Sequence, residues 1–144
     1  MTTVRSAKSK GSQFEYDCQY SLSKIYPDIY RTSERGFQMQ YDLTSDTHYI
    51  AFECKRLKSL SWNQAKKYYE KLKTKAPEKN CYLLFKSNQQ PCLVFNKYKD
   101  ASRIEYDDEE TSYYVVRTFE DVFGVPFLKH PSTRNQKREK VTNG

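Results

Sequence analysis

The fold is decided by residues 37–56, which read FQMQYDLTSDTHYIAFECKR. Every second side chain is apolar in residues 37–43, and the same alternation returns in residues 49–55. A period of two residues is the pattern of a β-strand with one buried face. Residues 44–47, which are Thr, Ser, Asp and Thr, supply the chemistry of a turn. The stretch therefore predicts an antiparallel β-hairpin.

The two strands of this hairpin must pair so that both apolar faces reach the same core. The apolar positions are odd-numbered in the first strand and even-numbered in the second, so the loop must have an even length. A turn centred at residues 46–47 places Asp42 opposite Ala51. Glu53 is then diagonal to Asp42, with about 7–8 Å between the two backbone positions. Lys55 follows on the same face as Glu53.

Two acids and a lysine on one sheet face point to a cation site. Carboxylates at this spacing can share one hard cation, and Mg²⁺ prefers oxygen ligands in octahedral geometry. A metal-bound water can attack a phosphodiester, while Lys55 orients or deprotonates that water and offsets charge on phosphorus. The alternative is an ordinary solvated face with a Glu53/Lys55 pair, and the spacing alone leaves both open.

A helix is expected from Ser12 until Pro27 ends it. Ser12 is a good N-cap residue, and Glu15 stands three residues later, which is the spacing of a capping box. Apolar side chains recur at helical spacing from Phe14 to Ile25, so one buried stripe is predicted.

A second helix is expected to begin after Ser61 and to end before Pro77. Four residues at helical spacing form its expected buried stripe: Trp62, Ala65, Tyr69 and Leu72. Its surroundings are strongly basic, because residues 55–79 contain nine basic and two acidic side chains.

Shorter runs elsewhere predict strands at residues 29–32, 81–85, 92–95 and 113–117, with a short helix at 119–123. The expected order is α-β-β-β-α-β-β, followed by a further strand and helix. A chain of 144 residues fits one compact domain.

The net charge of +7 is unevenly distributed along the chain. Residues 1–10 hold +3 and residues 129–144 hold +4, so residues 11–128 sum to zero. We expect a flexible basic arm, a folded domain and a disordered basic tail over these three ranges. Basic surfaces and tails fit a polyanionic partner, because neutralised phosphates release counterions. Charge alone is equally compatible with solvated, solubilising segments.

Cys18, Cys54, Cys81 and Cys92 are scattered without a C-x-x-C pair, so a structural zinc site is not expected. Buried thiols of a reducing compartment are the simpler interpretation. No run approaches the roughly 18 apolar residues of a membrane helix. The chain is expected to be soluble and intracellular, in the cytoplasm or, for a viral protein, in the host cytoplasm.

The run from Asp42 to Glu53-Cys54-Lys55 resembles the D…(D/E)-x-K motif of PD-(D/E)xK nucleases, with Tyr41 where proline often stands. Residues 10–15, KGSQFE, resemble the start of archaeal-type Holliday junction resolvases, whose first-helix Ser and Glu contribute to the site. The resemblance covers residues 10–96 and includes the order of elements. It implies an α/β, restriction-endonuclease-like core with a mixed sheet flanked by helices.

The same resemblance implies roles for individual residues. Mg²⁺, which Mn²⁺ replaces, is expected at Asp42, Glu53, Glu15 and the backbone carbonyl of Cys54. The expected catalytic residues are Glu15, Asp42, Glu53, Lys55 and Gln64. Contacts with DNA are expected from Ser12, Arg35, Lys58, Lys66, Lys67, Tyr68 and Lys71. A capping residue at Glu15 and an ordinary exposed side chain at Gln64 are the alternatives.

The implied reaction is hydrolysis of DNA phosphodiesters that leaves a 5′-phosphate. The expected substrate is branched DNA of recombination and repair, particularly Holliday junctions, cut by a homodimer with one site per strand. A DNA-end or restriction-type nuclease is an alternative, and so is a non-catalytic nucleic-acid-binding module. Asp42 and Glu53 argue against the binding module, which has no need for acids facing phosphate.

Overall fold

The computed structural model of this chain describes residues 3–35, 41–99 and 112–131. Within these residues the α-helices are α1 (Thr3–Leu22), α2 (Trp62–Lys75) and α3 (Phe119–Phe123). The strands are β1 (Tyr30–Arg31), β2 (Leu43–Ser45), β3 (Ile50–Arg56), β4 (Asn80–Lys86), β5 (Leu93–Lys99) and β6 (Ser112–Thr118). A 3-10 helix, η1 (Thr32–Arg35), follows β1.

The strands form one sheet in the order β1-β2-β3-β4-β5-β6. Strands β3 and β4 run parallel, and the other neighbouring pairs run antiparallel. A parallel pair needs a long crossover, which α2 supplies. The predicted order of elements and the mixed α/β sheet flanked by helices are confirmed.

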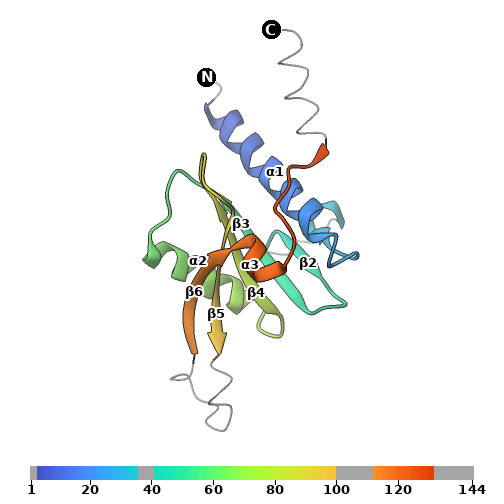
Figure 1. Cartoon of the computed structure of the whole chain (residues 1–144), viewed down its shortest axis with the longest axis vertical. Coiled ribbons are helices and arrows are strands. Elements are labelled where there is room, and N and C mark those ends of the chain that lie inside the picture. Colours follow the sequence, from blue (N-terminus) through green and yellow to red (C-terminus); the bar gives the residue numbers. More distant parts are fainter. Residues whose placement is uncertain (1–2, 36–40, 100–111, 132–144) are drawn as a thin grey trace.

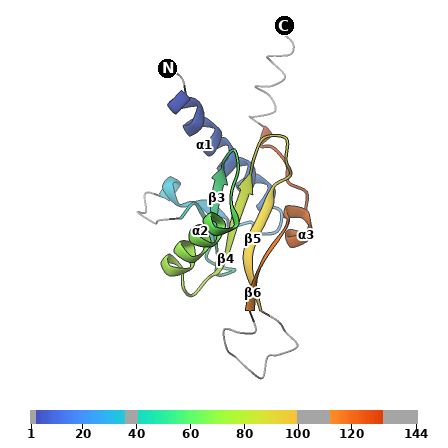
Figure 2. The ribbon, with the colours of Figure 1, turned by 90° about the vertical axis from the view of Figure 1, so that its left-hand side faces the viewer.

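Helices cover both faces of the sheet (Figure 1). Helices α1 and α3 pack on one face, where Phe14, Phe52 and Phe119 belong to the same buried cluster. Helix α2 packs on the opposite face, where Ala51 and Tyr69 belong to a second cluster. Figure 2 shows α2 and α3 on opposite sides of the strands. Both faces of β3 are therefore partly buried, which restricts where polar side chains can emerge.

Helix α1 begins earlier than the sequence predicted. It starts at Thr3, so Ser12 lies inside the helix and the predicted Ser12/Glu15 capping box is wrong. The Ser-x-x-Glu spacing also fits the interior of a helix, and upstream residues continue the helical backbone. The backbone of residues 3–10, where an arm was expected, is part of this helix. The predicted apolar stripe is confirmed, with Phe14, Cys18 and Leu22 buried.

The hairpin has the predicted even loop, but its register is shifted by two residues. Leu43 pairs with Phe52, so the four residues Asp46–Tyr49 form the turn. Thr44 lies opposite Ala51, so the predicted pairing of Asp42 with Ala51 is wrong. The shift by two residues moves Asp42 along the hairpin toward the level of Glu53.

The shifted turn is held by Asp28, which lies well before the hairpin in the chain. Its Oδ1 accepts a hydrogen bond from Ser45 Oγ at 2.6 Å, and its Oδ2 accepts one from the Thr47 N–H at 3.1 Å. These hydrogen bonds hold the pKa of Asp28 well below its usual range. Residues 37–40 of the predicted first strand lie outside the described residues, and β2 itself begins at Leu43.

Helix α2 forms as predicted except at its first residue. Ser61 and Gln64 form a capping box, with Ser61 Oγ accepting from the Gln64 N–H at 3.1 Å. Ala65, Tyr69 and Leu72 are buried as expected, but Trp62 is 51% exposed, so its predicted burial is wrong. The Trp62 ring contacts the Phe95 ring edge-on, with 5.2 Å between the ring centres. Trp62 therefore lies at the edge of the core, and much of its side chain remains exposed.

The segment after α3, which we call the C-terminal segment (residues 125–131), lies against α1 (Figure 1). Ser21 Oγ donates to the Leu128 carbonyl at 2.9 Å and accepts from the Leu128 N–H at 2.8 Å. The His130 N–H donates to Asp17 Oδ1 at 2.7 Å. A disordered tail was expected from residue 129, but His130 is hydrogen-bonded to α1; residues 132–144 lie outside the described residues.

The cysteines match the expectation of buried thiols. Cys18, Cys81 and Cys92 are buried, Cys54 is half-buried, and each of the four is free. In the described residues, no helix has the length and apolar character needed to cross a membrane.

Candidate active site

Asp42 and Glu53 meet where the chain enters β2 beside β3. The backbone of Asp42 is fixed on both sides, because its N–H donates to the Phe52 carbonyl at 3.1 Å and its carbonyl accepts from the Thr32 N–H at 3.1 Å. Asp42 Oδ2 accepts from the Cys54 N–H at 2.8 Å. The Glu53 carboxyl lies beside that of Asp42, close enough to act on its pKa. The start of the hairpin thus directs one acid against the other.

The position of Asp42 disfavours its negative charge. Burial, followed by the adjacent Glu53 carboxyl, raises the pKa of Asp42 from 3.8 to about 7, although the Cys54 N–H acts in the opposite direction. Like charges in contact at a partly desolvated site cannot both be ionised at low cost. Near neutral pH such a pair either shares a proton or binds a cation.

Glu15 reaches this pair from α1. Burial, followed by the charge of Asp42, raises the pKa of Glu15 from 4.5 to about 7. The carboxyl groups of Glu15 and Asp42 lie near each other, and each acts on the pKa of the other. On its other side, Glu15 Oε2 accepts from Arg31 Nη2 at 2.8 Å and from Arg31 Nε at 3.1 Å. The structure therefore brings Glu15, Asp42 and Glu53 together, with Arg31 behind the first of them.

Sequence reasoning missed Arg31. Its side chain is only 12% exposed, and its guanidinium lies 4.1 Å from the centre of the Tyr16 ring. Arg31 also approaches Glu34, with 3.8 Å between Nη1 and Oε1. The available signal was a single cation inside the short predicted strand at residues 29–32. Its partner, Glu15, could not be read from that strand.

Lys55 follows Glu53 by two residues on β3, so both side chains project from the same face. Its ammonium lies 4.7 Å from the centre of the Tyr68 ring on α2. Such a cation–π contact contributes about 0.5–1 kcal/mol at a partly exposed site and limits the freedom of the lysine. Gln64, predicted to be catalytic, lies one turn before Tyr68, and its amide closes the capping box of α2.

The predicted DNA contacts fall into two groups. One group lies on α2 or just before it: Lys58, Lys66, Lys67, Tyr68 and Lys71. The other group consists of Ser12, which is exposed on α1, and Arg35 at the end of η1. Arg35 stacks on Tyr30, with 3.7 Å from its guanidinium to the ring centre. In this second group, Ser12 is on α1, which also carries Glu15, and Arg35 precedes Asp42 in the chain.

The donor atoms around Asp42 have the chemistry that a hard cation prefers. They are carboxylate oxygens, and the predicted carbonyl of Cys54 would be a further oxygen donor. In the described part of the chain, no three or more His, Cys, Asp or Glu side chains are grouped so that they could hold a metal ion. Here Glu15 Oε2 is engaged by Arg31. Mg²⁺ thus fits the chemistry of Asp42 and Glu53.

The sequence matches no protein-family model, and no curated protein matches it. Among solved structures, this fold is similar to Hjc, a Holliday junction resolvase from the hyperthermophilic archaeon Archaeoglobus fulgidus, whose structure was solved at 1.6 Å resolution. The TM-score is 0.47 and the sequence identity is 17%. The likeness covers 83% of this chain and 99% of that chain.

Proposed function

We propose that this protein is a metal-dependent DNA endonuclease of the PD-(D/E)xK type. The observation that supports this most strongly is the contact between the Asp42 and Glu53 carboxyl groups, with Lys55 on the same face of β3. Because Asp42 is partly buried and its pKa is raised, a divalent cation would stabilise the charged form of this pair of acids. A fold without such a ligand would be more stable with one of these acids replaced.

The residues of the site have separate roles in this proposal. Asp42 and Glu53 hold Mg²⁺, which supplies an activated water and neutralises charge on the reacting phosphate. The Cys54 N–H keeps Asp42 aimed into the site at 2.8 Å. Lys55 offsets the charge that develops on the phosphate oxygens, and Tyr68 keeps its ammonium in place.

Hydrolysis balances with one water molecule. Its oxygen forms a new bond to phosphorus, the bond from phosphorus to the 3′ oxygen breaks, and the products carry a 5′-phosphate and a 3′-hydroxyl. Glu15 is proposed as a third acid of the site, and Arg31 positions it by the 2.8 Å ion pair. The role of Arg31 is positioning, because the guanidinium touches Glu15 and Tyr16.

The proposed substrate is branched DNA, including four-way junctions. Lysines on and before α2 lie near the element that carries Lys55, so they can follow the phosphates of a bound duplex arm. A homodimer is proposed because a two-fold arrangement presents two sites to two opposed strands.

The direct test is cleavage of labelled four-way junction, flap, duplex and single-stranded DNA, with Mg²⁺, with Mn²⁺ and with a chelator. The junction is expected to be cut in the presence of either metal, and each product should carry a 5′-phosphate. A protein that binds these DNAs but cuts none of them with either metal would instead be a binding module.

Substitutions separate catalysis from binding. Asp42→Asn and Glu53→Gln are expected to abolish cleavage while leaving DNA affinity equal or higher, because less acid faces the phosphate. Lys55→Met should lower the rate by about 10²–10³-fold. Asp46→Asn is the matched control, since Asp46 lies in the hairpin turn and pairs with Lys79 at 2.9 Å. Loss of DNA binding with unchanged turnover in Asp42→Asn would contradict the proposal.

A further inference from the structure

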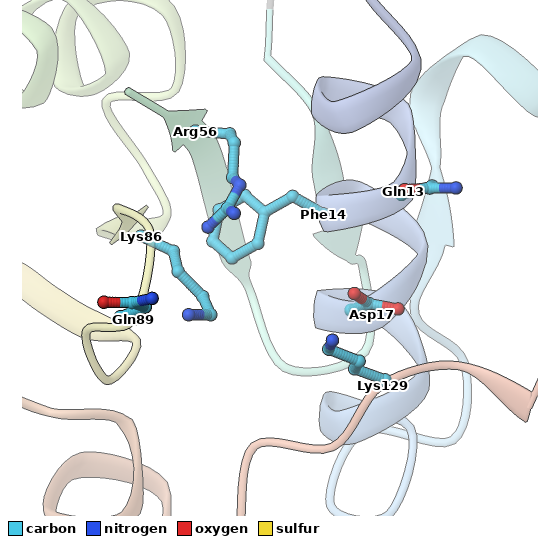
Figure 3. Close-up of a pocket in the computed structure, with 7 residues that line it drawn as sticks. All are labelled: Gln13, Phe14, Asp17, Arg56, Lys86, Gln89 and Lys129. Carbon is cyan, nitrogen blue, oxygen red and sulfur yellow. The ribbon is translucent and has the colours of Figure 1, made fainter. Parts of the chain in front are cut away.

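A second polar cavity lies on the other side of β3 from Lys55. It has a volume of about 410 Å³ and is bounded by α1, the end of β3, the β4–β5 turn and the C-terminal segment (Figure 3). This volume is within the range of small-ligand clefts. Arg56, Lys86 and Lys129 reach it from three different elements, and Asp17 is the acid in its wall.

Arg56 is the last residue of β3, and its guanidinium is only partly used. Nη2 donates to Asn88 Oδ1 at 2.6 Å. Nη1 is enclosed and has no hydrogen-bond partner within the described residues. Leaving a buried donor unpaired is costly, more so for a charged group, so an acceptor is the missing partner.

Lys86 and Lys129 add positive charge to the same cavity. Lys86 Nζ donates to the Gln90 carbonyl at 2.6 Å, and burial together with the Arg56 charge lowers the pKa of Lys86. Lys129 stands between Leu128 and His130, whose backbones are hydrogen-bonded to α1. The chain thus holds three cations close together against their mutual repulsion, which an anionic ligand would relieve.

The wall contains one acid, Asp17, which interacts with Lys129 and Arg56 but cannot neutralise all three cations. Asp17 Oδ1 already accepts the hydrogen bond from the His130 N–H at 2.7 Å, and burial raises the pKa of Asp17. Gln89 at the rim adopts a left-handed backbone with φ of 61°, which a non-glycine residue adopts at some cost. The cavity is therefore cationic, and its turn is held in an uncommon conformation.

We propose that this cavity binds a phosphate group through Arg56, Lys86 and Lys129. A guanidinium and two ammonium groups that line one cavity can supply the planar and point-charge contacts that phosphate oxygens accept. The same chemistry is offered by inorganic phosphate, a terminal phosphate monoester and a backbone diester. The structure favours none of these three by shape alone, and the measurements below distinguish them.

The extension to DNA rests on the proposed nuclease function. Lys55 and Arg56 are consecutive in β3, so their side chains project from opposite faces of the sheet. A phosphate at Arg56 is consequently separate from the one that is cut beside Lys55. The cavity should hold a different phosphate of the bound strand or of a neighbouring arm, and so contribute to KM rather than to kcat.

The first experiment measures phosphate binding without any cleavage. Inorganic phosphate is titrated into the full chain at constant ionic strength, and backbone amide shifts are followed by NMR. Binding should perturb the amides of Arg56, Lys86 and Lys129, and Lys129→Glu should weaken it by at least about tenfold. Lys24→Gln is the control, because Lys24 is exposed on the turn after α1. Equal phosphate affinity in Lys129→Glu and in the unmodified chain would overturn the proposal.

Lys86→Gln provides a second variant at an independent position, and folding is checked by circular dichroism. Because Lys86 also binds the β4–β5 turn, Lys129→Glu on the exposed C-terminal segment remains the decisive change. Perturbed amides confined to α2 would place the anion elsewhere and also overturn the proposal.

The second experiment identifies the source of the phosphate. A 5′-phosphorylated strand that binds about tenfold better than its 5′-hydroxyl form, in the unmodified chain only, indicates a terminal monoester. Equal binding of both forms, weakened alike by Lys129→Glu, indicates a backbone diester. Weakened inorganic phosphate binding with unchanged DNA affinity indicates the free ion.

The kinetic measurement separates this inference from the nuclease proposal. Lys129→Glu should raise KM for junction DNA about five- to tenfold and leave kcat within about twofold. A fall in kcat at unchanged KM would refute the separate phosphate site in DNA recognition. Absence of all cleavage, with phosphate binding intact and sensitive to Lys129→Glu, would refute the nuclease and support the phosphate site.

Discussion

Asp42 combines a well-ordered backbone with an unfavourable charge. Its pKa is raised from 3.8 to about 7, so the folded protein binds this proton more tightly than the unfolded chain does. The stabilisation from the bound proton is fully present below about pH 4 and is lost as the pH rises through about 7. Asp42→Asn retains an acceptor for the Cys54 N–H and should remove this pH dependence. We expect the variant to be more stable by about 1–3 kcal/mol near pH 8, with little difference near pH 4.

Thermal unfolding at the two pH values, without and with Mg²⁺, checks this expectation. Mg²⁺ near pH 8 should raise the Tm of the unmodified chain and leave Asp42→Asn nearly unchanged, because binding to the folded state alone is stabilising. A variant that is less stable than the unmodified chain near pH 8 would show that the Asp42 charge is already compensated.

The sequence predicted the positions of some site residues correctly and of others incorrectly. Alternation put Glu53 and Lys55 on one face correctly, because a strand buried on both sides fixes which side each residue faces. The register of the strand before the turn was predicted two residues away from its place. The turn that accompanies this register is held by the hydrogen bond between Asp28 and Ser45. Contacts between distant segments have no local pattern, and for the same reason the ion pair between α1 and Arg31 was missed.

At the scale of elements, α2 carries a testable electrostatic role. Lys67 and Lys71 are exposed on consecutive turns, where they can neutralise phosphates. Changing both to Gln should lower the slope of log Kd against log salt concentration by about 2, since each phosphate contact contributes about one. Fluorescence anisotropy over a salt series measures this, with Lys24→Gln, which removes one charge away from α2, as a control. An unchanged slope would remove α2 from the DNA-binding surface.

Helices and strands with a clear apolar period were predicted well, and their ends were not. The buried side of α2 followed from Ala65, Tyr69 and Leu72 at helical spacing. Trp62 fits the same spacing, but a residue in the first turn is covered only if the neighbouring sheet extends that far. Ser12 shows the corresponding limit for capping patterns, which identify a helix end only when the upstream backbone leaves the helix.

For the whole molecule, the proposed homodimer makes a prediction about the products. Two sites related by a two-fold axis should make paired, symmetric nicks on opposed strands of a four-way junction. Sequencing gels of each labelled strand locate the nicks, and light scattering gives the mass of the active species. A preference for linear duplex or free ends, or a monomeric active form, would argue for another kind of nuclease.

The bond between Ser21 and Leu128 has a consequence for how the protein is made. These residues are 107 positions apart, yet Leu128 completes the packing of the first helix. At synthesis rates of roughly 5–20 residues per second, α1 leaves the ribosome on the order of 5–20 s before its last partner. Early in that interval Phe14 and Leu22 have neither the sheet nor the C-terminal segment to cover them, and after the strands are made they still lack the C-terminal segment. The apolar stripe of the first helix therefore stays open to chaperones or to aggregation until the end of the domain is made.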